Sequence, residues 1–265
     1  MADYRTRTLE MRGGKLSIEV LEGGSGDPLV YLHGARSLGG WNPHLDRLAD
    51  RYHVFAPCHP GTGGSTGLEH LDDLWDLVLC YEEILDSLTS RPYHIIGLSY
   101  GGMIGTELAA QNPAKVRSLV LVGAIGLWLD ESPIADIYVL GPEERAKATW
   151  HNPASEAARA YMAQPEDPEA KREAELSNIE ALASTGKFIW PIPDKGLRKR
   201  IHRITSPTLM VWGKSDGLVP PVYADEFQRL IPGSRSVVIE ECGHLPYLER
   251  PEEYFQNVFD FLSQS

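Results

Sequence analysis

The chain has 265 residues, 42% of them hydrophobic, and it carries 37 acidic against 25 basic residues, a formal net charge of −12. This size and composition are those of a globular protein with a large core, and they exclude a disordered chain. An acidic surface repels nucleic-acid backbones and anionic lipid, and no uncharged apolar stretch reaches ~18 residues, so neither nucleic acid nor a membrane is an expected partner.

Predicted strands and helices alternate along most of the chain. The segments Tyr4–Met11 and Leu16–Leu21 alternate apolar and polar side chains, which predicts an antiparallel hairpin with one solvated face. Short apolar runs follow, typical of strands buried on both faces of a parallel sheet: Leu29–Leu32, Val54–Pro57, His94–Leu98, Leu119–Val122, Thr208–Trp212 and Ser236–Glu240. Helical patterns lie between or after them at Trp41–Asp50, Leu71–Leu88, Met103–Gln111, Val222–Ile231 and Glu252–Leu262. We therefore predict an α/β fold with a doubly wound, mostly parallel sheet of eight strands.

The strand pattern is interrupted from about Ala124 to Ile204. Proline at the first helical position predicts three helices here, after Gly141, Asn152 and Asp167, and the side chains of Asn152 and Asp167 are candidate N-caps. A helical block inserted between two strands predicts a cap over the C-terminal edge of the sheet. The expected organisation is a core of residues 1–123 and 204–265 with a helical cap of residues 124–203.

The segment Gly97-Leu98-Ser99-Tyr100-Gly101 has the G-x-S-x-G pattern between a predicted strand and a predicted helix. Glycine removes side chains where a sharp turn brings backbones together, and the helix N-terminus favours developing negative charge. A turn rich in glycine and serine without a catalytic role is the alternative. The strand–turn–helix context favours Ser99 as a nucleophile.

A serine hydroxyl needs a base, and that base needs an orienting acid. Asp216 follows the predicted strand Thr208–Trp212, and His244 follows the predicted strand Ser236–Glu240. Taken alone, Asp216 is compatible with a turn and His244 with a helix cap. Three such residues at three strand ends in the order Ser, Asp, His are far more specific. The sequence therefore predicts a catalytic triad of Ser99, His244 and Asp216.

Backbone N–H groups are expected to stabilise the charge that forms on the substrate oxygen. The first buried strand runs into His33-Gly34-Ala35-Arg36, where Gly34 permits a tight turn. We expect the N–H groups of Ala35 and Tyr100 to form an oxyanion hole. His33 is interpreted as a residue that stabilises the turn.

These motifs together resemble the α/β-hydrolase superfamily, in the capped branch that contains esterases, C–C bond hydrolases, epoxide hydrolases and dehalogenases. The resemblance implies the fold and hydrolase activity, and a serine nucleophile implies attack on a carbonyl rather than on a saturated carbon. Family members often have Asp where this chain has Cys58, so we expect a change in loop bonding rather than in chemistry. The matching residues span nearly the whole core: His33-Gly34, Pro60-Gly61-x-Gly63-x-Ser65, Gly97-x-Ser99-x-Gly101-Gly102, Trp212-Gly213-x-x-Asp216-x-x-x-Pro220, Gly243-His244 and Glu249-Arg250-Pro251.

The predicted function is a cofactor-free and metal-free serine hydrolase that cleaves a small carboxylic ester or lactone through an acyl-enzyme. Two alternatives stay open: a C–C bond hydrolase of a dicarbonyl product of ring cleavage, and a slow-turnover ligand receptor, which an intact triad disfavours. Candidate residues of an apolar, cap-lined pocket are Trp128, Trp150 and Trp190. Arg36 is a further candidate, either for a substrate carboxylate or for an outward salt bridge.

Other features of the sequence indicate the setting of the protein. Its first residues are polar and lack the apolar region of a signal peptide. The three cysteines, Cys58, Cys80 and Cys242, have no metal-binding spacing and imply no disulfide framework. We expect a cytoplasmic protein, and assembly into a homo-oligomer stays open.

Overall fold

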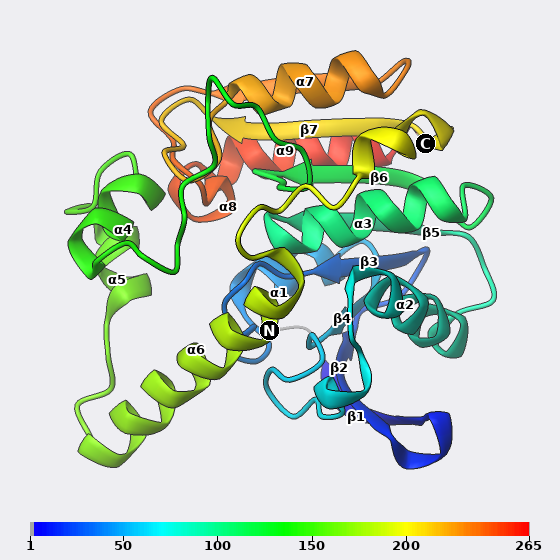
Figure 1. Cartoon of the computed structure of the whole chain (residues 1–265), viewed down its shortest axis with the longest axis horizontal. Coiled ribbons are helices and arrows are strands. Elements are labelled where there is room, and N and C mark those ends of the chain that lie inside the picture. The colour runs from blue at the N-terminus through cyan, green and yellow to red at the C-terminus, as the bar shows by residue number, and fades with distance from the viewer. Residues whose placement is uncertain (1–2, 265) are drawn as a thin grey trace.

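One eight-stranded sheet crosses the computed structural model, which describes residues 3–264 (Figure 1). The strands lie in the order β1-β2-β4-β3-β5-β6-β7-β8. The first three of these are joined by antiparallel pairing and the others by parallel pairing, so the predicted α/β fold is confirmed. Their bounds are β1 Tyr4–Met11, β2 Leu16–Gly23, β3 Pro28–Leu32, β4 His53–Pro57, β5 Tyr93–Leu98, β6 Val116–Val122, β7 Thr208–Gly213 and β8 Arg235–Ile239.

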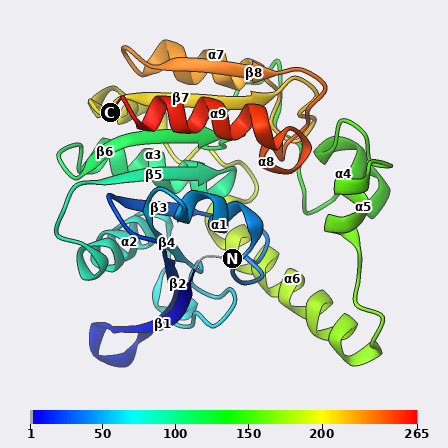
Figure 2. The same cartoon turned by 180° about the vertical axis from the view of Figure 1, so that it is seen from behind.

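Helices cover both faces of the sheet (Figures 1 and 2). On one face lie α2 (Leu74–Leu88), α3 (Tyr100–Gln111) and α7 (Val222–Leu230), and on the other lie α1 (Pro43–Ala49) and α9 (Pro251–Leu262). Each face buries its own cluster of apolar side chains, because the sheet separates the two layers of helices. The short α8 (Pro246–Glu249) precedes α9, and 3-10 turns lie at Arg12–Gly14, Leu68–His70, Leu197–Lys199 and Ile201–Arg203.

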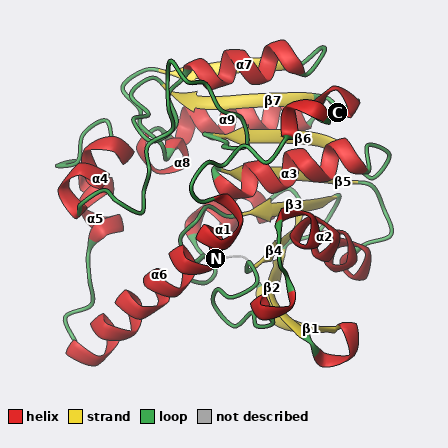
Figure 3. Cartoon of the chain, viewed as in Figure 1, coloured by secondary structure: helices red, strands yellow, loops and turns green. Residues whose placement is uncertain are grey.

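Three helices separate β6 from β7 in the chain: α4 (Pro142–Thr149), α5 (Glu156–Met162) and α6 (Pro168–Ile189). They lie beyond the end of the sheet to which the arrowhead of β7 points (Figure 3). The C-terminal half of α6 packs on the loop after β4, where the Ser184 hydroxyl donates to the Gly61 carbonyl at 2.8 Å. Among residues 3–264, no helix combines the length and the apolar character needed to cross a membrane.

One predicted helix cap is wrong. Asn152 accepts a hydrogen bond from the Ala154 N–H and forms a turn, whereas α5 begins three residues later with Ser155 as its N-cap. The Asp167 cap is present, since its carboxylate accepts from the Ala170 N–H. An Asx turn and an N-cap use the same side-chain bond, so the sequence does not distinguish them.

Several predicted helix starts are also displaced. Helix α1 begins at Pro43, because the Asn42 side chain accepts from two N–H groups of the first turn. Helix α2 begins at Leu74, after the Asp73 cap, and α3 already begins at Tyr100 rather than at Met103. Glycine-rich sequence hides the start of α3, because Gly101 and Gly102 have low helix propensity.

Four buried histidines predict a marked loss of stability in mild acid. Burial lowers the pKa of His33 to about 4, of His44 to about 3 and of His94 to about 4, and it lowers the pKa of His59 well below its usual value. In the unfolded chain these groups titrate near pKa ~6.5, so between ~6.5 and ~4 the unfolded state binds more protons than the native state. The free energy of unfolding should therefore fall with decreasing pH, by about 1.4 kcal/mol per pH unit for each histidine.

The replacement His44→Phe isolates one of these protons, because the pKa of His44 is lowered by burial alone. We expect urea unfolding of this variant to show a slope against pH that is shallower by about one proton. An unfolding free energy of the wild type that stays constant from pH ~7 to pH ~5 would contradict the prediction.

Candidate active site

Ser99 occupies a strained turn between β5 and α3. Its backbone has φ 51° and ψ −109°, a left-handed conformation that is costly for a residue with a side chain. The neighbouring glycines are required by space: a Cβ at Gly97 would lie 2.6 Å from the Gly101 carbonyl oxygen, and one at Gly101 would lie 2.1 Å from the Leu32 carbonyl oxygen. The turn brings the Ser99 hydroxyl to the N-terminus of α3, where the helix dipole favours an anion.

His244 and Asp216 are joined by a buried hydrogen bond. The His244 Nδ1–H donates to Asp216 Oδ2 at 2.7 Å, and the two residues are 5% and 4% exposed. Asp216 Oδ1 accepts from the backbone N–H groups of Leu218 and Val219 at 3.0 and 2.9 Å. Because Nδ1 carries the proton, Nε2 of His244 has a free lone pair.

Gly123, at the end of β6, lies against this pair. Its φ is +50°, and a Cβ there would lie 2.9 Å from both Cε1 and Nδ1 of His244 and 3.1 Å from Asp216 Oδ2. A side chain at this position would displace the imidazole from the carboxylate. Gly123 is a positioning residue that the sequence reading missed, because a glycine after a strand is a common turn signal.

The backbone N–H groups of Ala35 and Tyr100 are the predicted oxyanion-hole donors. Neither group donates to an acceptor within residues 3–264. The turn that carries Ala35 is held by two neutral histidines: His33 Nδ1–H donates to the Gly34 and Arg36 carbonyls at 2.9 Å. His59 Nε2–H donates to the His33 carbonyl at 2.7 Å, and burial lowers the pKa of His59 well below its usual value.

The end of α4 contacts the loops of the acid and the base through the backbone. The His244 N–H donates to the Thr149 carbonyl at 2.7 Å, and the Gly217 N–H donates to the Ala148 carbonyl at 2.9 Å. Glu249 adds a bridge, since its carboxylate accepts from the N–H groups of Gly243 and His151 at 2.8 and 2.9 Å. Residues 124–203 therefore help to hold His244 in place although they supply no member of the predicted triad.

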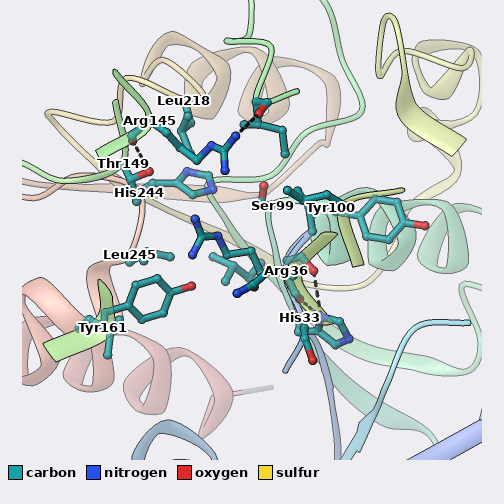
Figure 4. Close-up of a pocket in the computed structure, with 18 of the residues that line it drawn as sticks. His33, Arg36, Ser99, Tyr100, Arg145, Thr149, Tyr161, Leu218, His244 and Leu245 are labelled. Carbon is teal, nitrogen blue, oxygen red and sulfur yellow. Dashed lines mark hydrogen bonds between the residues drawn. The ribbon is translucent and has the colours of Figure 1, made fainter. Parts of the chain in front are cut away.

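Ser99 and His244 point into one pocket of about 1100 Å³ (Figure 4). The structure brings the predicted pocket residues Arg36, Trp128, Trp150 and Trp190 to its wall, together with Ala35 and Tyr100. Trp150 is 2% exposed and lies edge-on against Tyr161, whereas Trp190 is 56% exposed. Asp216 lies behind His244, outside the wall.

Arg145 is a pocket residue that the sequence analysis did not identify. It lies in α4 between acidic and basic neighbours, Glu143, Glu144 and Lys147, a pattern typical of a solvated helix face. No local signal distinguishes a helix face that turns toward a cavity, because that orientation depends on tertiary packing.

The cysteines have no part in the pocket wall. The Cys58 thiol donates to Glu19 Oε1 at 3.2 Å, and burial together with Glu19 raises the pKa of this thiol. Burial also raises the pKa of Cys242 to about 12. Both therefore stay protonated, and the bond of Cys58 in its loop is made to Glu19.

Comparison with known proteins agrees with this geometry. The family model described as the alpha/beta hydrolase fold matches residues 27–251. The chain therefore belongs to the alpha/beta hydrolase fold family.

The enzyme is a hydrolase, and its named relatives cover most of its length. It is 27% identical over 277 positions to a pimeloyl-(acyl-carrier protein) methyl ester esterase of Nitrosomonas europaea, an alignment that covers 93% of this chain and 99% of the relative. It is 28% identical to a 2-hydroxy-6-oxo-6-(2'-aminophenyl)hexa-2,4-dienoic acid hydrolase of Metapseudomonas resinovorans, with 96% and 90% covered. A solved structure of a lipase-like protein (putative lipase, lip1) from Acinetobacter baumannii superposes with a TM-score of 0.76 at 26% identity, covering 98% of this chain and 91% of that one.

Proposed function

We propose that the enzyme is a serine hydrolase that cleaves a carboxylic ester or lactone through an acyl-enzyme. In this mechanism His244 Nε2 takes the proton of Ser99 while the Ser99 oxygen attacks the substrate carbonyl. The oxyanion accepts from the N–H groups of Ala35 and Tyr100, and His244 then gives its proton to the departing alkoxide. Water cleaves the acyl-enzyme by the same steps and restores Ser99.

The observation that carries this proposal is the bond between His244 and Asp216 beside a pocket that also contains Ser99. This bond leaves the His244 nitrogen that faces away from Asp216 ready to accept a proton. Within the described chain, the Ser99 side chain caps no helix N–H, so helix capping does not account for the strained backbone at this position. This combination favours a reaction over the passive binding of a ligand receptor.

We also assign residues 124–203 as a cap over a core of residues 1–123 and 204–265. The cap residues supply much of the apolar wall, and several of them are also partly exposed to solvent, including Tyr161, Met162, Ile179 and Trp190. An apolar pocket of this size fits a hydrophobic acyl or alcohol group.

A panel of nitrophenyl esters of increasing acyl length, together with lactones, tests the proposed reaction. We expect a burst of one nitrophenol per active site, followed by slower turnover, and labelling of Ser99 by a serine-directed phosphonate. Binding and labelling without any turnover would instead support the slow-turnover receptor. The absence of both labelling and turnover with every member of the panel would contradict the serine mechanism.

A second candidate function is the hydrolysis of a C–C bond in a dicarbonyl product of ring cleavage. The relative from Metapseudomonas resinovorans favours it, since the alignment covers 96% of this chain. The conjugated dienol of such a substrate absorbs light, so its cleavage is followed by loss of absorbance. Dicarbonyl cleavage with a kcat/KM above that of every ester would make this the main activity.

The substitution Trp150→Leu tests the role of the cap in selectivity. Trp150 is buried in the pocket wall, so we expect the ranking of acyl lengths to change by about 10–200-fold in relative kcat/KM. Labelling of Ser99 by a small phosphonate should stay within a few-fold of the wild type. Trp75→Leu is the matched control, because Trp75 is 46% exposed on α2 and lies outside the pocket. An unchanged acyl-length profile in Trp150→Leu would show that this wall does not set selectivity.

A further inference from the structure

Two arginines extend into the pocket from different elements. Arg36 belongs to the turn after β3, and Arg145 belongs to α4. Figure 4 shows both side chains reaching into the pocket that holds Ser99 and His244. A guanidinium is charged at any physiological pH, so the pocket contains two permanent positive charges in a mostly apolar wall.

Neither charge is neutralised by the protein. Within residues 3–264, no carboxylate oxygen lies within 4.0 Å of either guanidinium, although the chain has 37 acidic residues. Arg47, a third arginine of the same wall, is instead paired bidentately with Glu252 at 2.6 and 2.7 Å. Arg36 and Arg145 therefore differ from Arg47 in facing the pocket without a carboxylate partner in the described chain.

The hydrogen bonds of the two side chains leave donors free. Arg145 Nη2 donates to the carbonyls of Ile137 and Leu140 at 2.9 and 3.1 Å, which fixes its orientation. Its Nε is buried without an acceptor, and its Nη1 has no acceptor in the part of the chain that the structure describes. The Arg36 guanidinium lies over the face of the Tyr161 ring, 5.9 Å from the ring centre, and donates no hydrogen bond within residues 3–264.

The two guanidinium groups also repel each other. Burial and the nearby charge of Arg36 lower the pKa of Arg145, which places the two groups within electrostatic reach. Two acidic residues line the same pocket, but Asp136 accepts the Tyr138 N–H and Glu175 is exposed on α6. An anion between the two arginines would remove this repulsion and occupy the free donors.

We propose that Arg36 and Arg145 form a subsite for a carboxylate of the substrate. The substrate class is then a carboxylic ester that carries a second, free carboxylate, such as the half-ester of a dicarboxylic acid. A planar carboxylate with a single charge can accept from two N–H groups of the Arg36 guanidinium at once. The rest of the ligand then contacts the apolar wall. The subsite adds a substrate class to the proposed function. It rests on that function only for the chemical step, the cleavage of the ester.

Binding to the Ser99→Ala variant tests the subsite without turnover. The ligands are monomethyl glutarate, which has a free carboxylate, and dimethyl glutarate, its neutral counterpart. We expect calorimetry to show the half-ester binding at least about tenfold more tightly than the diester. Adding Arg36→Gln should remove about tenfold of the half-ester affinity and leave the diester within threefold.

Arg36→Gln is the decisive variant, because Arg36 donates no side-chain hydrogen bond to the described protein and its loss leaves no carbonyl unpaired. Arg145→Gln should have a similar effect on the half-ester, with thermal unfolding as a check on the two lost backbone bonds. Arg51→Gln is the matched control and should change neither affinity, since Arg51 is exposed, lies outside this pocket and packs over the Phe259 ring.

Equal affinities for half-ester and diester, or no binding of either up to millimolar concentration, would overturn the subsite. An equal loss of half-ester affinity in Arg51→Gln would also overturn it, since a general electrostatic effect would then be at work. A phosphonate analogue that binds about tenfold more tightly than the half-ester would replace carboxylate by phosphate as the ligand. Carboxylate preference without ester turnover by the wild type supports the subsite and refutes the proposed reaction, and ester turnover without the preference does the reverse.

Discussion

Replacement of Ser99 by alanine should lower kcat toward an activated ester by about 10⁶. The variant loses the atom that attacks the carbonyl, whereas Ala35, Tyr100 and His244 keep their places. Removing the hydroxyl should also leave folding intact, because Ser99 makes no helix-capping bond within residues 3–264. The measurement is the steady-state and burst rate of nitrophenol release, together with thermal unfolding of both proteins.

Ser37→Ala provides the matched control, since Ser37 is another serine of the pocket wall. It should keep burst and turnover near the wild-type level. If Ser99→Ala retained more than about 1% of wild-type kcat with a good substrate, another nucleophile would be acting and the triad would be wrong.

The replacement Asp216→Asn should lower kcat by about 10⁴ at nearly unchanged structure. The N–H groups of Leu218 and Val219 both donate to Asp216 Oδ1, so they would hold the oxygen of the new amide at that position. The amide NH₂ would then face His244 Nδ1, which can no longer donate to it. His244 would take the tautomer with a proton on Nε2 and could not accept the proton of Ser99.

This effect differs from a general loss of charge. Phosphonate labelling of Ser99 should slow together with kcat, and KM should change little, because Asp216 lies behind His244 and outside the pocket wall. Asp225→Asn, at an exposed position of α7, removes the same charge far from this bond and should leave kcat unchanged. Wild-type labelling by Asp216→Asn would show that Asp216 does not set the tautomer.

Local patterns in the sequence predict the sheet and the surroundings of Ser99 well. Buried parallel strands have continuous apolar runs, and the glycines around Ser99 are required by contacts of 2.1 to 2.6 Å that leave no space for a side chain. The contact between Asp216 and His244 follows from strand ends that meet at one edge of the sheet. These features depend on short segments or on a regular topology, so they can be predicted from the amino-acid sequence.

The features that the sequence does not predict depend on packing between distant segments. Nothing around Arg145 indicates that it turns into the pocket, and nothing around Gly123 indicates that an imidazole lies 2.9 Å from its missing side chain. Asn152 has the local pattern of an N-cap and forms a turn instead. The Gly123 contact depends on packing with a distant segment, whereas Arg145 is oriented by the Ile137 and Leu140 carbonyls. At Asn152 a competing local bond decides the outcome.

The segment 124–203 contributes to the pocket wall, and through the carbonyls of Ala148 and Thr149 it also holds the loops that carry His244 and Asp216. Transplanting this segment between relatives, a common way to alter the preferences of an enzyme, would exchange the acceptors of the His244 and Gly217 N–H groups as well. A transplant that shifts the end of α4 would displace the imidazole and slow every substrate alike. Successful chimeras should therefore keep their junctions outside the last turn of α4 and preserve its backbone path. In natural divergence the same link means that new preferences are acquired most easily in the mostly exposed first half of α6, because α5 packs against α8, which follows His244.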